Sequence, residues 1–169
     1  YIPNIDANGV IHIASLNNWV FFSAYVNGGK TTAVGKLEAD IEGVTEDMVI
    51  KDFRGTLDGD YHTMTLNINH PAERAGLIET LGGTIKNLYL QGTVTTEGKY
   101  AGGVAGAGGN SGVNIQNVVC KVNIVSGVDG DGTHGGMIGY SNVALNITNS
   151  MFAGSISGEK THSCGGFVG

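Results

Sequence analysis

The sequence predicts an all-β chain folded as a right-handed parallel β-helix (a solenoid), with a short N-terminal helix that caps it. Three observations lead to this prediction. The 169 residues include 29 Gly but only 2 Pro, and 14% are charged, which suits many tight turns between short strands. Only one stretch has a helical period. From residue 75 onward, two short motifs recur together at intervals near 30 residues, as in repeat proteins.

We expect one domain over residues 1–169. It divides into an N-terminal strand and capping helix (1–30), the first coils (31–74) and the β-helix repeats (75–169).

The capping helix is predicted from Ser15 to Asn27. Trp19, Phe22 and Val26 recur at helical spacing, Ser15 stands at the N-cap position, and Asn27-Gly28-Gly29 supplies a stop. So short a helix gains its stability by laying the Trp19 face on apolar neighbours. The next segment has strand character, because apolar residues alternate over residues 33–41 and 63–69, with an Asp-Gly turn at residues 57–60 between them.

The first repeated motif is a glycine-led apolar box. The second residue of each box is Gly76, Gly103, Gly136 or Gly166, at intervals of 27, 33 and 30 residues. Paired glycines before apolar residues are expected at a sharp corner, where a side chain would clash with the next coil.

The second motif centres on an asparagine, found at Asn87, Asn117 and Asn149, at intervals of 30 and 32 residues. Stacking in register would place these residues one above another, so we expect an asparagine ladder in which each amide bonds to the next. The alternative, three exposed turn residues unrelated in space, stays open.

At these motifs the sequence resembles the GLUG-motif repeat proteins of bacterial surfaces, which include adhesin-like proteins and regions beside IgA-specific metallopeptidases. The resemblance covers about residues 10–169 and depends on residues 53–59 with 62–64, on residues 83–88 and on the glycine boxes. It implies the β-helix fold and an extracellular or cell-surface location, but no ligand. No H-E-x-x-H occurs, so peptidase activity is not carried over. Glu79 stands where the box expects glycine, which predicts a looser corner or an insertion there.

Charge and cysteine content limit the possible partners. The net charge is −6 with scattered Lys and Arg, which argues against nucleic acid, and no apolar run approaches the ~18 residues of a membrane span. Cys120 and Cys164 fall at different positions of the coil, so we expect two free thiols, Cys120 buried and Cys164 near a turn.

Few residues suggest chemistry. Asp58, Asp60 and His62 are interpreted as a structural turn, and the five histidines as solvated turn residues. Asp129 and Asp131 are the one calcium candidate, and no other cofactor is expected. Exposed tyrosines could stack on sugars, and a row of them on one face would form a platform; the candidates are Tyr61, Tyr89, Tyr100 and Tyr140.

The sequence therefore favours a non-catalytic surface module, adhesin-like or a spacer, that presents a β-helix face to host glycans, proteins or neighbouring copies of itself. The alternatives are a polysaccharide lyase or hydrolase of the β-helix type, a non-catalytic part of a larger peptidase, or a stalk without a ligand. Because the repeat breaks off within the glycine box at residues 165–169, we expect the stack to continue beyond it or to be covered by another chain.

Overall fold

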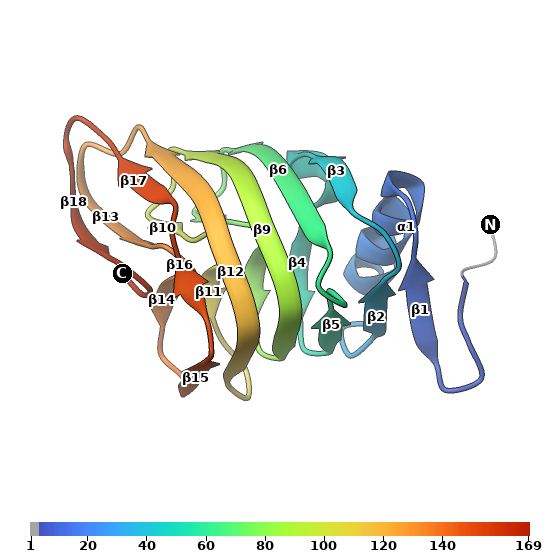
Figure 1. The fold of residues 1–169 in the computed structure, drawn as a ribbon. Helices are drawn as coiled ribbons and strands as arrows, with labels where there is room; N and C mark the ends of the chain where they lie inside the picture. Colours follow the sequence, from blue (N-terminus) through green and yellow to red (C-terminus); the bar gives the residue numbers. More distant parts are fainter. Residues whose placement is uncertain (1–3) are drawn as a thin grey trace.

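The computed structural model describes residues 4–169 and confirms the predicted fold class. Parallel sheets stack as a β-helix of about four turns, with one helix closing the N-terminal end of the described chain (Figure 1).

The N-terminal end consists of β1 (Val10–Ile13) and α1 (Leu16–Asn27). The Ser15 hydroxyl accepts a hydrogen bond from the Asn18 N–H at 3.2 Å, so the predicted N-cap is present. Trp19 is fully buried, and its indole N–H donates to the Met48 carbonyl at 3.1 Å. The Phe22 ring meets the Phe53 ring edge-on, with centroids 6.0 Å apart. The helix thus covers the apolar end of the first coil.

Successive coils follow along the chain. The first contains β2 (Val34–Leu37), β3 (Ile41–Val44), the 3-10 helix η1 (Glu46–Met48) and β4 (Ile50–Phe53). The second contains β5 (Thr56–Asp58), β6 (Thr63–His70), β7 (Arg74–Ala75) and β8 (Ile78–Leu81). The third contains β9 (Thr84–Thr96), β10 (Tyr100–Ala101) and β11 (Ala105–Gly108). The fourth contains β12 (Val113–Ser126), β13 (Gly130–Gly135) and β14 (Ile138–Ser141). The last contains β15 (Leu145–Thr148), β16 (Met151–Phe152), β17 (Ser155–Ser157) and β18 (Thr161–Gly165).

One expected strand is divided. The alternation over residues 33–41 suggested a continuous strand, but the chain bends at residues 38–40 between β2 and β3. Leu37 and Ile41 are both buried on either side of this bend. The alternation correctly indicated which side chains point inward and which point outward, but the alternating segment contains a corner of the coil.

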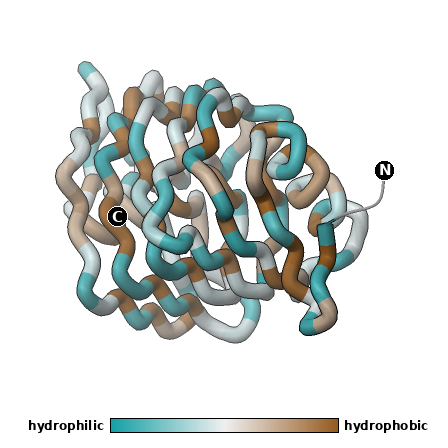
Figure 2. Tube along the Cα trace, turned by 45° about the vertical axis from the view of Figure 1, so that its right-hand side comes forward, coloured by the Kyte–Doolittle hydropathy of each residue, from teal (hydrophilic) through white to brown (hydrophobic). Residues whose placement is uncertain are grey.

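The coils stack with like residues above like. A long sheet runs β1-β2-β5-β9-β12-β15 and is continued by β3, β6, β16 and β17, while two smaller sheets run β7-β10-β13-β18 and β4-β8-β11-β14. Leu57 pairs with Ile85 and Ile85 with Ile115, and each of the three is 0% exposed. Apolar and polar positions alternate along the trace in Figure 2. The core is therefore a column of apolar side chains along the stack.

The three asparagines mark a bend in the long sheet. Asn87, Asn117 and Asn149 have φ values of 53°, 54° and 47°, in the left-handed region that asparagine tolerates better than most residues. The Asn117 amide donates to the Asn87 carbonyl oxygen at 3.0 Å, and the Asn87 amide donates to Asp58 Oδ1 at 3.2 Å. The expected ladder thus joins two asparagines and ends on an aspartate.

Asn149 has the same backbone conformation but is exposed. At that level the neighbouring Ser150 hydroxyl accepts a hydrogen bond from the Val118 N–H at 3.1 Å.

The glycine corners are sterically closed. A Cβ at Gly103 would lie 2.4 Å from Cys120 Sγ, and one at Gly136 would lie 2.2 Å from the Gly166 carbonyl oxygen. The expected looseness at Glu79 is wrong, since Leu77 and Ile78 are fully buried and Ile78 pairs in register with Ala105. Glu79 fits because β7 is the first strand of the β7-β10-β13-β18 sheet, so no earlier strand of that sheet crowds the Glu79 side chain. The Glu79 carboxylate lies 3.2 Å from His70 Nε2.

Candidate functional site: a pocket on the outer face of the long sheet

A pocket of about 330 Å³ opens on the outer face of the long sheet, just after the asparagine bend. Strands from four successive coils line it, each contributing the residues that face away from the core or their backbone. The lining residues are Thr63, Tyr89, Leu90, Gln91, Val119, Lys121 and Met151.

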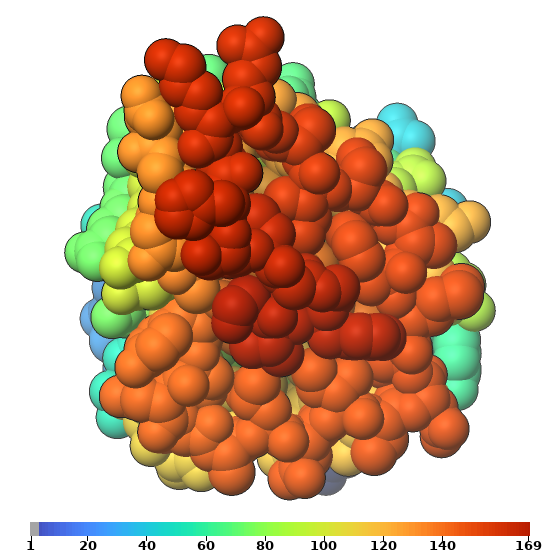
Figure 3. Space-filling model, turned by 90° about the vertical axis from the view of Figure 1, so that its left-hand side faces the viewer, coloured from blue at the N-terminus to red at the C-terminus, as the bar shows by residue number. Residues whose placement is uncertain are grey.

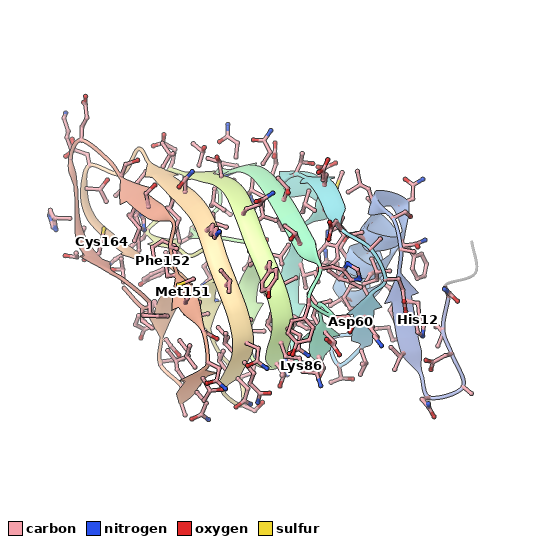
Figure 4. All side chains as sticks on the ribbon, in the orientation of Figure 1. His12, Asp60, Lys86, Met151, Phe152 and Cys164 are labelled. Atoms are coloured by element: carbon pink, nitrogen blue, oxygen red, sulfur yellow. The ribbon has the colours of Figure 1, made fainter. Side chains whose placement is uncertain are left out.

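The parallel register brings these residues together. Thr63 pairs with Tyr89, Tyr89 with Val119, and Val119 with Met151, so the four form one row across the coils. Tyr89 and Met151 are 40% and 49% exposed, which leaves an aromatic ring and a thioether accessible to solvent. Figure 4 shows Met151 on β16, beside β12. The row gives the pocket an apolar strip.

A polar row runs beside it. Gln91 pairs with Lys121 in the register, and the Gln91 amide nitrogen donates to the Thr65 hydroxyl at 2.9 Å. Within residues 4–169, no carboxylate oxygen lies within 4.0 Å of the Lys121 ammonium. A tyrosine face, an amide and an unpaired ammonium can together stack on a sugar ring and bind its hydroxyl or carboxylate groups.

The tyrosines do not form one platform. Tyr89 lies in the long sheet, whereas Tyr100 and Tyr140 lie in the two small sheets, with their ring centroids 5.2 Å apart. The Lys99 ammonium is 5.6 Å from the centroid of the Tyr100 ring. Tyr61 is 57% exposed at the turn after β5. Tyr89, Tyr100 and Tyr140 therefore do not form one row, because they lie in three different sheets.

The calcium candidates each face a lysine. Asp129 lies 3.5 Å from the Lys160 ammonium and Asp131 lies 3.5 Å from the Lys99 ammonium. Desolvation raises the pKa of Asp131, but the Lys99 charge and several hydrogen bonds together lower it below its ordinary value. In the described part of the chain, no group of three His, Cys, Asp or Glu is placed to hold a metal ion.

Asp58 lies at the start of a local turn, which the sequence indicated. Asp58 Oδ1 accepts the Asp60 N–H at 2.9 Å, which is a local turn bond. His62 lies 3.4 Å from Asp40 on the preceding coil, and Asp60 lies 4.0 Å from the Lys36 ammonium. The three residues therefore have separate partners.

Sequence reasoning missed a buried polar cluster. His134 is 0% exposed, and its Nε2 lies 2.8 Å from the Ser126 hydroxyl. The interpretation of all histidines as solvated is wrong here, because His134 occupies the inward column of Ala75 and Ala101. Burial lowers the His134 pKa and favours the neutral ring. Ser126 also accepts the Val128 N–H at 3.2 Å, so the hydroxyl stabilises the turn into β13. In the sequence, the only signal of this cluster was a serine eight residues before a histidine.

Both thiols are free, as expected. Cys120 is buried, and desolvation raises its pKa to about 11, whereas Cys164 is exposed in β18 next to the glycine corner.

No family model, curated protein or solved structure matches the chain. Among residues 4–169, no helix is long and apolar enough to cross a membrane. The resemblance to GLUG-motif proteins thus stays a prediction from the sequence, while the parallel β-helix with its capping helix is the architecture of this chain.

Proposed function

We propose that this protein is a non-catalytic extracellular module of a bacterial surface protein, and that its Tyr89 pocket binds a glycan. The observation that carries the proposal is the combination, in one pocket, of the exposed Tyr89 ring with the Gln91 amide and the Lys121 ammonium. Sugar rings have apolar faces that stack on aromatic residues, and their hydroxyl groups bond to amides and ammonium groups. An acidic sugar would also pair with the lysine.

The architecture supports a binding role. Hydrogen bonds between parallel strands hold the backbone of the pocket residues in register, so little backbone order has to be gained on binding. The surface location is proposed from the resemblance of the glycine boxes and the asparagine motif to surface repeat proteins.

The test is binding of the purified protein to a panel of acidic and neutral glycans. Tyr89→Ala should weaken binding about tenfold, the equivalent of about 1.4 kcal/mol, because a stacking ring is lost. Lys121→Ala should weaken the binding of acidic glycans more than that of neutral glycans. Tyr61→Ala is the matched control, since Tyr61 is an exposed tyrosine outside the pocket.

Three results would overturn the proposal. Release of shortened glycan would make the protein a polysaccharide-processing enzyme. Binding that is equally strong in the parent and Tyr89→Ala proteins would place the site elsewhere. Failure on both glycan and protein arrays would favour a stalk without a ligand.

A further inference from the structure

The core is open at the end of the stack, where no strand of residues 4–169 lies beyond the last coil. Figure 3 looks onto this end, where the last coil covers the face turned to the viewer. Ile147 and Ile156 occupy the register positions of Ile115 and Ile124, which are 0% exposed, yet both are only partly buried. Phe167, placed in its glycine box as Met137 is in the preceding one, is 42% exposed where Met137 is 0% exposed.

Cys164 belongs to the same open face. It pairs in register with His134, which pairs with Ala101, and both of these are fully buried in an inward column. Cys164 is exposed although it continues this column. In the described chain, no strand lies beyond β18 to cover it, whereas β13 is covered by β18.

Gly166 gives an independent indication of what covers this face. A Cβ at Gly136 would lie 2.2 Å from the carbonyl oxygen of the coil beyond it, which explains the need for glycine there. A Cβ at Gly166 would meet nothing within 4 Å, and its φ lies outside the left-handed range. No contact among residues 4–169 therefore requires glycine at position 166. A backbone carbonyl stacked above it, as at Gly136, would require it.

The backbone hydrogen bonds repeat in the same sense. The N–H groups of Gly103 and Val104 donate to the carbonyls of Gly136 and Met137 at 3.0 Å each. One coil later, the N–H groups of Gly136 and Met137 donate to the carbonyls of Gly166 and Phe167 at 3.0 Å each. Applied once more, the pattern places carbonyl acceptors above the N–H groups of Gly166 and Phe167.

We propose that this end face, formed by β14 to β18 with Gly166 at its corner, binds one further coil of the same repeat, about 30 residues long and running parallel to the last coil. The interface continues the one that already joins the fourth coil to the last. It would bury the apolar column and pair the free edges of all three sheets.

A second copy of this chain fits the face less well. Its N-terminal end is closed, because α1 covers the core there and Ile5 pairs antiparallel with Ile11 on β1. Two end faces related by a two-fold axis would bring their strands together antiparallel, which does not reproduce the carbonyl above Gly166.

The experiment extends the protein by one coil and uses Cys164 as the reporter. Residues 140–169 are repeated after Gly169, with the cysteine of the copy replaced by serine. A docked coil should abolish alkylation of Cys164 in the native state and raise the melting temperature by at least about 3 °C. Cys120 is buried and does not contribute to the signal.

Gly166→Val is the matched variant. In the 169-residue protein it should leave the melting temperature nearly unchanged, because a Cβ at this position meets nothing within 4 Å. In the extended protein it should restore Cys164 alkylation and remove the gain in melting temperature. Two results would overturn the proposal: an extended protein in which Cys164 reacts as in the parent, or equal protection in the presence of Gly166→Val. A parent protein that dimerises with loss of Cys164 alkylation would assign the face to a second copy instead.

Discussion

The side-chain amide of Asn117 donates a hydrogen bond to the side-chain oxygen of Asn87 at 3.0 Å, across 30 residues of chain. Both residues are in the left-handed conformation, and Asp58 accepts the next bond of the series at 3.2 Å. The bond joins two coils at the point where the long sheet bends. The backbone conformation therefore favours asparagine or glycine at this position, and the side-chain bond favours asparagine.

Replacing Asn117 with alanine should destabilise the protein by about 2 kcal/mol, since it removes a hydrogen bond and alanine tolerates the left-handed conformation less well than asparagine. Asn117→Gly should cost about half of that, because glycine accepts the conformation and only the bond is lost. Denaturant unfolding measures both. Gln116→Ala, an exposed neighbour, should change stability by less than about 0.5 kcal/mol. Equal losses of stability in the alanine and glycine variants would contradict the contribution of backbone conformation.

Gly136→Val should destabilise the fold by about 3 kcal/mol or more, because the new Cβ would lie 2.2 Å from a backbone oxygen that cannot move without its coil. The Phe152 ring, 2.4 Å away, adds to the clash. Thermal unfolding of the 169-residue protein measures the effect. A Gly136→Val protein that melts with its parent would show that the corner is not tightly stacked.

The ion cluster at His12 should make stability depend on pH. The His12 ring bonds to Asp6 at 2.8 Å and to Glu38. These two bonds raise the His12 pKa above 6.5, and the bond to Asp6 has the larger effect. The same histidine lowers the pKa of Asp6 below 3.8. The stabilisation is therefore complete between pH 3.8 and 6.5, and it is lost as pH rises through the raised histidine pKa or falls through the lowered aspartate pKa.

Melting temperatures of the parent and His12→Asn proteins test this dependence. The difference between them should be larger at about pH 5 than at about pH 9. His162→Asn is the control, because His162 is exposed and its ring bonds only the adjacent Ser163 among the described residues. A His12→Asn difference that is the same at both pH values would exclude the cluster as the cause.

The two thiols should differ in reactivity. Burial raises the Cys120 pKa to about 11, so its thiolate is scarce and shielded, whereas Cys164 is exposed. Iodoacetamide at about pH 8 should modify one thiol per native chain and two after unfolding, counted by mass spectrometry. Cys164→Ser should abolish the native reaction. Modification of Cys120 in the native protein would mean that the core around β12 opens readily.

The sequence by itself determined the repeat and hence the fold. Stacking in register needs only that like residues recur at a near-constant interval, and the glycine boxes and asparagine motifs show this without any structure. The capping helix followed from its local period and its Ser15 cap, since both are short-range features. Inward and outward positions followed from alternation along each strand.

Only the tertiary structure decided which outward residues meet. Tyr89 shares a pocket with Met151 because two register pairings, through Val119, join them across the coils, while Tyr100 and Tyr140 lie in the two other sheets. Alternation distinguishes the inside from the outside of a coil, but it does not say where the chain turns. For the same reason the bond between His134 and Ser126 was hidden, because the turn between β12 and β13 brings the two residues together inside the core.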